Sequence, residues 1–254
     1  MATISTPSSV VNRKEARCRF YTWVAVGAAL VVFLGFARTY YLKGLYGTPP
    51  PFRPVLSPLL HVHGLVMTTW FVLSFVQVRL VAAQRTDLHR RLGVAGAMLA
   101  GLVVGIDGDV TLRNVHRSFM AHPESPHALG FLAINFGILL SFAILIASAI
   151  LLRRRPDYHK RFMALACLSI LGPAIDRLSL TLPFLQFLDS LSQWKMFGVW
   201  DLGAAVCIGV DALKNRKLHP AWLWGAILIL GTQLVTGVLT YVPAWQRFAA
   251  WLVR

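Results

Sequence analysis

Two histidines stand two positions apart in the stretch LLHVHGLVMTTW, residues 59–70, where a long apolar segment begins. Imidazole nitrogens bind haem iron, copper and zinc, and they exchange protons near neutral pH. On an ideal α-helix, residues two positions apart point about 200° away from each other. His61 and His63 can therefore bind one ion only if the first helical turn is frayed. We expect one of them to face a helix bundle and the other to face the lipid headgroups.

Ionisable side chains inside other apolar segments are further candidates, because each costs a few kcal/mol in lipid and commonly marks a cavity or a charged partner. At 1.5 Å per residue, Asp107 and Asp176 lie roughly 21 Å from the cytoplasmic ends of their segments. Asp201 and His63 lie about 6–7 Å from the outer ends of theirs. These depths predict one polar layer in the outer half of the protein. The residues expected in this layer or at its rim also include Asp109, Arg113, Arg177, Arg38, His61 and His127.

Three interpretations of this outer layer remain open. In the first, it is a structural ion network in which arginines neutralise the three buried aspartates, which leaves the histidines without a role. In the second, His61 or His63 and His127 bind haem or a metal from facing helices, and a carboxylate such as Asp107 or Asp109 completes a copper or zinc site. In the third, the layer belongs to a small-molecule or proton-coupled transporter.

The transporter interpretation rests on polar stripes. His63, Trp70 and Gln77 recur every seven residues on one face of their segment. The last apolar segment carries a second stripe, and Gly172 and Pro173 in LGPAI indicate a broken helix, as is common at transporter sites. Polar residues that merely join helices produce the same pattern. The second stripe comprises Thr232 or Gln233, Thr236 and Thr240. Asn135 is a further polar residue, in the middle of another segment.

Composition places this chain in a membrane. Of its 254 residues, 56% are hydrophobic and only 14% are charged, and its mean hydropathy is +0.61, a balance that a soluble domain cannot bury in one core. The formal net charge of +15 comes from Lys and Arg in short loops, which is the positive-inside pattern and argues against nucleic-acid binding. The tryptophans are consistent with belts at the membrane surfaces.

The apolar segments predict an all-α, seven-transmembrane-helix bundle in the cytoplasmic (inner) membrane. With the N-terminus inside, 16 of the 25 Lys and Arg residues lie on the cytoplasmic side, which places the C-terminus outside. We expect a basic tail over 1–19, one transmembrane domain over 20–241 and an interfacial segment over 242–254. The seven segments are about 20–41, 59–82, 93–113, 129–152, 162–181, 196–213 and 220–241.

A repeat in the cytoplasmic turns divides these helices. RTDLHRRL at 85–92 matches RPDYHKRF at 155–162, 70 residues later, and KLHPAW near 217 is a fainter copy. One lone helix is thus followed by three helical hairpins. The Asp and His of each copy are explained by helix capping and headgroup contact. The three cysteines predict neither a disulfide framework nor a zinc site, and no motif of a hydrolase or nucleotide-binding enzyme is present.

The strings GFARTYYL, HVHGLVMTTW, LHRRLG, RRRPDYHKRFM and KLHPAWLWG, in this order, resemble an uncharacterised family of bacterial multi-pass membrane proteins over about residues 30–240. The resemblance implies a fold and a membrane location. More locally, HKRFMALACLS is similar to a helix start of histidine-rich membrane proteins linked to cytochrome oxidase assembly. That similarity implies a haem or copper role for His159 and the outer histidines.

The function favoured by these patterns is a haem- or metal-binding redox or cofactor-assembly protein, with haem b or copper held by His63 together with His61 or His127. Asp107, Asp176 and Arg177 would shape this site, and other membrane redox subunits would be partners. A transporter is the main alternative, and a structural membrane subunit without a ligand is the other. The patterns do not decide whether the protein is an enzyme.

Overall fold

The computed structural model contains helices and no β-strand in the residues that it describes, which are 7–50, 52, 55–123, 127–186 and 194–254. Side chains are described from residue 19 onward, except those of residues 127 and 194–196. The elements in chain order are α1 (Pro7–Phe36), the π-helical turn η1 (Ala37–Tyr41), α2 (Lys43–Tyr46), α3 (Pro58–Ala82), α4 (Thr86–Ala121), α5 (His127–Leu151), α6 (Pro156–Ser169), α7 (Gly172–Asp176), α8 (Leu178–Thr181), α9 (Trp194–Asn215), α10 (Pro220–Leu239) and α11 (Pro243–Val253).

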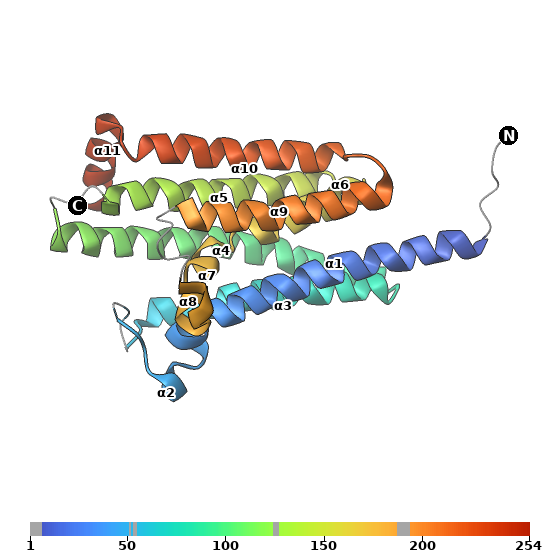
Figure 1. The fold of residues 1–254 in the computed structure, drawn as a ribbon, viewed down its shortest axis with the longest axis horizontal. Coiled ribbons are helices and arrows are strands. Elements are labelled where there is room, and N and C mark those ends of the chain that lie inside the picture. The colour runs from blue at the N-terminus through green and yellow to red at the C-terminus, as the bar shows by residue number, and fades with distance from the viewer. Residues whose placement is uncertain (1–6, 51, 53–54, 124–126, 187–193) are drawn as a thin grey trace.

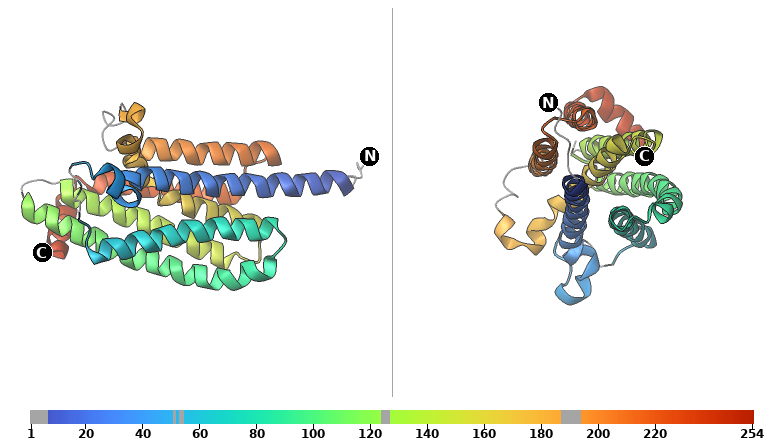
Figure 2. Two further views of the ribbon diagram at one scale, coloured as in Figure 1. Left: turned by 90° about the horizontal axis from the view of Figure 1, so that it is seen from below. Right: turned by 90° about the vertical axis from the view of Figure 1, so that its right-hand side faces the viewer.

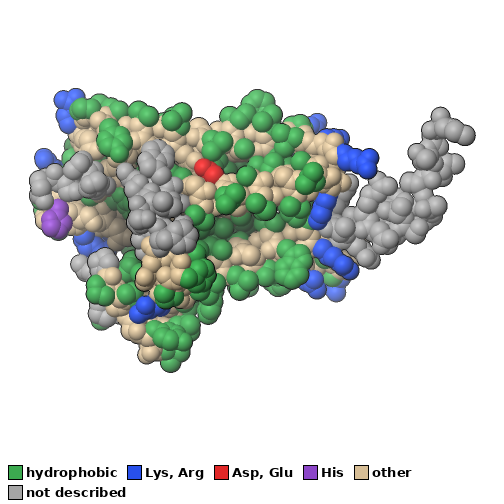
Figure 3. All heavy atoms as spheres, in the orientation of Figure 1, with side chains coloured by type: hydrophobic (Ala, Val, Ile, Leu, Met, Phe, Trp, Pro, Cys, Tyr) green, Lys and Arg blue, Asp and Glu red, His purple; other side chains and the backbone are tan. Residues whose placement is uncertain are grey.

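The long helices lie side by side along the longest axis of the molecule (Figures 1 and 2). α1 begins at the same end of the bundle as the turns that join α3 to α4, α5 to α6 and α9 to α10. We call this the basic end, because the predicted cytoplasmic arginines and lysines lie in these turns. The short helix α11 lies across the opposite end (Figure 1). Hydrophobic side chains cover much of the surface between the two ends (Figure 3).

Five helices in the described part of the chain are long and apolar enough to cross a membrane: Arg19–Tyr41, Pro58–Ala82, Thr86–Ala121, Ala128–Leu151 and Pro220–Leu239. They indicate an integral membrane protein that contacts a lipid bilayer. The sixth predicted segment lies in α9, which is 22 residues long but carries Asp201, Asp211 and Lys214. The fifth predicted segment, 162–181, is not one continuous helix.

The fifth segment is broken into α6, α7 and α8 where the sequence reads LGPAI. Pro173 lacks an amide hydrogen, and its ring clashes with the preceding helical turn, so the helix cannot continue through it. The carbonyl groups left at the end of α6 accept other hydrogen bonds: Trp200 Nε1 donates to the Leu168 carbonyl, and Ser169 Oγ donates to the Ala166 carbonyl at 2.9 Å. The indication of a broken helix is confirmed.

The core surrounds α5, whose span is 67% buried, whereas the α3 and α4 spans are each 17% buried. Trp222, Phe142, Leu145 and Leu165 are almost completely enclosed. Trp70, Trp200 and Trp222 belong to the same core, so the expectation that the tryptophans form surface belts is wrong for these three. Their indole rings supply large apolar areas that fill the space between helices.

A buried ion pair joins four helices near the basic end. Arg161 of α6 donates to Asp211 Oδ2 of α9 from Nη2 at 2.7 Å and from Nε at 2.9 Å. Trp222 Nε1 of α10 donates to the same oxygen at 2.9 Å, and Tyr21 Oη of α1 donates to Oδ1 at 3.4 Å. Both charged side chains are buried. The sequence patterns gave Asp211 no role, yet it accepts hydrogen bonds from α6, α10 and α1.

A close backbone contact fixes α1 against the broken helix. A Cβ atom at Gly35 would lie 2.2 Å from the carbonyl oxygen of Ala174 in α7, whereas a Cβ at the exposed Gly27 meets nothing within 4 Å. Gly35→Ala should therefore lower the free energy of unfolding by about 1–3 kcal/mol through overpacking. Gly27→Ala should raise it by up to about 1 kcal/mol through helix propensity. Chemical unfolding in one detergent measures both, and equal stability of the two variants would contradict this packing.

The buried ion pair gives a second test. Asp211→Ala and Arg161→Ala should each cost about 3–5 kcal/mol of unfolding free energy, because each leaves an uncompensated buried charge. The double variant should cost less than the sum of the two. The control is Asp87→Ala, which removes an exposed partner 3.8 Å from Arg85 and should cost less than about 1 kcal/mol. The assignment fails if Asp211→Ala is no more destabilising than Asp87→Ala in the same unfolding titration.

Candidate functional site

A histidine and an aspartate meet between α3 and α4 in the outer half of the bundle. His63 Nδ1 lies 3.5 Å from Asp107 Oδ1, and the two side chains are 20% and 25% exposed. His63 Nδ1 is buried and makes no hydrogen bond within the described residues. The two side chains are therefore close enough for an electrostatic interaction, but their geometry is not that of a hydrogen bond. The two residues are 44 positions apart in the chain, and their contact places them at one level of the bundle.

The two histidines of the HxH motif point in different directions, as the helical geometry predicts. His61 is exposed, whereas His63 turns toward α4. Tyr40 lies beside His61, with ring centroids 6.1 Å apart, and its hydroxyl donates to the His61 carbonyl at 3.3 Å. The side chain of His127 lies outside the described residues. The described residues hold no group of three His, Cys, Asp or Glu side chains that could bind a metal ion.

Two arginines of the layer bind backbone carbonyls around the broken helix. Arg177 donates from Nη1 to the Pro173 carbonyl at 2.6 Å, and its guanidinium lies 5.2 Å from the ring centroids of both Phe36 and Phe52. Arg38 donates from Nη1 to the Leu180 carbonyl at 3.0 Å. These contacts supply hydrogen bonds at helix ends, where carbonyls lack partners within the helix. Arg177 is also close enough to His63 for the two charges to interact.

The remaining acids of the layer have separate partners. Asp109 pairs with Arg113 one turn away on α4, at 2.9 Å, and Asp201 accepts a hydrogen bond from Gln233 Nε2 at 3.1 Å. Asp176 is exposed. The expected network, in which Arg38, Arg113 and Arg177 neutralise Asp107, Asp176 and Asp201, is therefore matched only in part. Arg177 lies close enough to Asp176 for their charges to interact, whereas Asp107 lies beside His63 and Asp201 beside Gln233. Arg113 pairs with Asp109 because the two lie one helical turn apart on α4, and Arg38, in the π-helical turn, donates to the Leu180 carbonyl.

The π-helical turn η1 lies at this site, within the membrane-spanning part of the first helix. Its closing hydrogen bond runs from the Leu42 amide to the Ala37 carbonyl at 2.6 Å. The turn places Arg38 against α8 and Tyr41 against α3, where the Tyr41 and Thr68 hydroxyls are 2.8 Å apart. Single π-helical turns within helices occur frequently at functional sites. Nothing in the ARTYY sequence indicated this turn.

A row of buried polar atoms without partners follows α3 from His63 toward the basic end. Within the described residues, His63 Nδ1, Trp70 Nε1, Gln77 Oε1 and, on α4, His89 Nδ1 are buried and make no hydrogen bond of ordinary geometry. The first three are the stripe with seven-residue spacing that the sequence contains. Trp70 is nevertheless near the Cys167 thiol, and His89 is near the Gln77 backbone. The ring of His89 lies 6.2 Å, centroid to centroid, from that of His159 on α6. Buried polar atoms are normally paired with protein or water.

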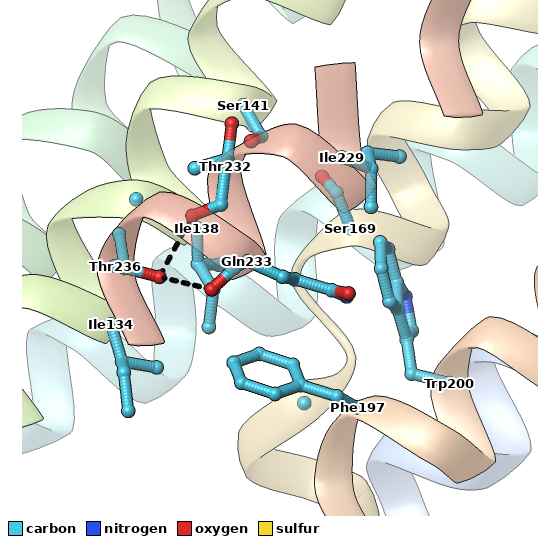
Figure 4. Close-up of a pocket in the computed structure, with 12 residues that line it drawn as sticks. Ile134, Ile138, Ser141, Ser169, Phe197, Trp200, Ile229, Thr232, Gln233 and Thr236 are labelled. Carbon is cyan, nitrogen blue, oxygen red and sulfur yellow. Dashed lines mark hydrogen bonds between the residues drawn. The ribbon is translucent and has the colours of Figure 1, made fainter. Parts of the chain in front are cut away.

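A small polar cavity adjoins the break between α6 and α7 (Figure 4). Its volume of about 20 Å³ is enough for one water molecule. The polar side chains that line it come from α5, α6 and α10, and Trp200 and Phe197 of α9 form one wall. Thr232, Gln233 and Thr236 belong to the second stripe recognised in the sequence, whereas Ser141, Ser169 and Trp200 were not recognised. The polar lining consists of Ser141, Ser169, Thr232, Gln233 and Thr236.

No protein-family model, curated protein or solved structure matches the chain.

The contact between His63 and Asp107 yields a prediction on stability. His63→Ala should lower the unfolding free energy by about 1–3 kcal/mol, because it leaves a largely buried carboxyl group without its neighbour. The cost should be smaller in the His63→Ala/Asp107→Ala double variant than the two single costs predict. His61→Ala is the matched control and should change stability by less than about 0.5 kcal/mol, since His61 is exposed. Strictly additive effects in the detergent unfolding titration would show that the two side chains do not interact.

Proposed function

We propose that this protein is a seven-crossing permease of the cytoplasmic membrane that couples a small polar solute to proton movement. The N-terminus would be inside and the C-terminus outside. Clustering of the basic turns at one end of the bundle supports this orientation. The sixth crossing would be α9, whose 22 residues extend about 33 Å. The fifth crossing would be the broken helix α6–α8. The seven crossings would then be the lone helix α1 followed by three hairpins, α3–α4, α5–α6 and α9–α10, as the sequence repeat predicts.

The row of unpaired polar atoms along α3 carries the proton part of this proposal. His63, Trp70 and Gln77 are each separated by about two helical turns, and His89 stands at the basic end, where the row ends. His63 and Asp107 can exchange a proton at the outer end, since imidazole and carboxyl groups both titrate in the physiological range when their surroundings shift them. Ionisable side chains within membrane helices mark proton relays and ion pathways in transporters.

The broken helix and its cavity support the solute part. Transporters bind solutes where discontinuous helices expose backbone groups near the bilayer centre. Here the break between Ser169 and Gly172 adjoins a cavity with four hydroxyl groups and the Gln233 amide. Gln233 also binds Asp201, which connects the cavity to the outer layer. Ser169, Thr232 and Thr236 donate to backbone carbonyls in this conformation, and the cavity has room for one water molecule. A small neutral or zwitterionic polar solute would therefore bind here in a conformation that widens the break.

A haem- or metal-binding redox or assembly protein is the second candidate. It is favoured by the buried His63 Nδ1, which makes no hydrogen bond within the described residues and so has the character of a ligand atom. In this candidate, haem b or copper would bind His63, and other membrane redox subunits would be the partners. The local similarity to histidine-rich assembly proteins agrees with such a role. Against it, His61 points away from His63, and a second imidazole would have to come from His127.

Proton flux in proteoliposomes tests the permease. Full-length protein is reconstituted with the pH dye pyranine inside, and a panel of amino acids, polyols and monovalent cations is added outside under a fixed membrane potential. We expect at least one solute to drive proton uptake, and we expect His63→Ala and Gln77→Leu each to reduce the rate at least ten-fold. Gln77→Leu removes a buried oxygen that makes no hydrogen bond, so a purely structural role predicts no loss. His61→Ala is the control and should keep the wild-type rate.

An absorption spectrum and metal analysis of the protein purified from its native host separate the two candidates. A Soret band, or near-stoichiometric copper that is lost in His63→Ala, together with no solute-driven flux, would replace the permease by the redox protein. A colourless, metal-free preparation with no flux for any solute in the panel would reject both and leave a structural membrane subunit.

A further inference from the structure

A groove of about 460 Å³ lies between the start of α3 and the outer part of α4. Leu59, Leu60 and Val110 give it an apolar side, and Arg113, Asn114 and Arg117 give it a polar side. The groove is distinct from the cavity at the helix break and from the buried row along α3. The combination of apolar and guanidinium-bearing walls matches a ligand that is itself part apolar and part anionic.

The charges around the groove leave a positive excess. Arg113 donates to both Asp109 oxygens through Nε, at 2.9 and 3.0 Å. Arg117 donates to the Asn114 side-chain oxygen, which is neutral. Two guanidinium groups therefore face one carboxylate, and the local charge of about +1 complements a phosphodiester, which guanidinium groups bind with two parallel hydrogen bonds.

Contacts with α11 place the groove at the level of the membrane surface. His116, which also lines the groove, binds the Val253 carbonyl at the end of α11 through Nδ1. α11 lies across the end of the bundle (Figure 1) and exposes Trp251 and Phe248, which is the arrangement of an amphipathic helix in the interface. The apolar side of the groove continues along α3 into Val62 and Leu65, which are exposed.

We propose that this groove binds the headgroup of an anionic phospholipid such as phosphatidylglycerol. Arg113 and Arg117 hold the phosphodiester, and the acyl chains extend past Leu59, Leu60 and Val110 onto the exposed apolar side of α3. Binding at this site is independent of the proposed transport function.

Native mass spectrometry of the full-length protein tests the proposal. The protein is released from micelles that contain equimolar phosphatidylglycerol and phosphatidylcholine, and the retained lipids are counted. The wild type should retain one phosphatidylglycerol in preference to phosphatidylcholine. Each arginine near an anionic headgroup contributes about five-fold to affinity, so Arg113→Ala/Arg117→Ala should weaken retention roughly 25-fold. The matched control is Arg90→Ala/Arg91→Ala, two exposed arginines at the basic end of the same helix, which should retain the lipid as the wild type does.

Three results would overturn this assignment. One is a wild-type protein that retains the two lipids equally, a comparison that needs no variant and so holds even if the double variant fails to fold. Another is an equal loss of bound lipid in the two double variants, which would mean that lipid retention depends only on the overall surface charge. The third is full displacement of phosphatidylglycerol by millimolar inorganic phosphate, which would make the groove a site for free anions.

Discussion

The buried pair of Arg161 and Asp211 is the interaction on which the arrangement of the helices depends. Desolvating two charges costs several kcal/mol per ion, and the cost is offset only where geometry and further hydrogen bonds are good. Asp211 meets this condition because Arg161, Trp222 and Tyr21 all donate to its carboxylate. These donors come from α6, α10 and α1, so one side chain of α9 sets the relative position of helices from the beginning, middle and end of the chain.

The opposite half of the bundle is built differently. There the fifth segment breaks, η1 interrupts the regular helix, and Arg38 and Arg177 bind carbonyls of the broken segment in place of carboxylates. Gly35 allows α1 to approach the backbone of α7 directly, which holds the broken segment in place without charge pairing. Within the described residues, the buried polar atoms without a hydrogen bond lie along α3, around η1 and α8, and on His89 at the basic end.

The proposed permease and the proposed lipid groove use separate parts of this outer half. His63 and Asp107 lie between α3 and α4, whereas the groove lies farther out along the same two helices, beyond Asp109. Because α4 has 36 residues and extends about 54 Å, it is longer than the hydrocarbon core of about 30 Å. In the proposed arrangement its outer part would present Arg113 and Arg117 at the headgroup level, while Asp107, in its middle, contacts His63 of α3.

An all-helical membrane protein can be predicted from the sequence alone, because apolar runs of about 20 residues and basic turns act locally and need no partner to be recognised. The sequence also predicted the opposed directions of His61 and His63 and the break at LGPAI, which follow from helical periodicity and from proline geometry. It did not predict which arginine pairs with which acid, the role of Asp211, the burial of Trp70, Trp200 and Trp222, or the turn η1. These features depend on which faces of distant helices meet and on how far a side chain can reach across that contact, so they are visible only in the folded protein.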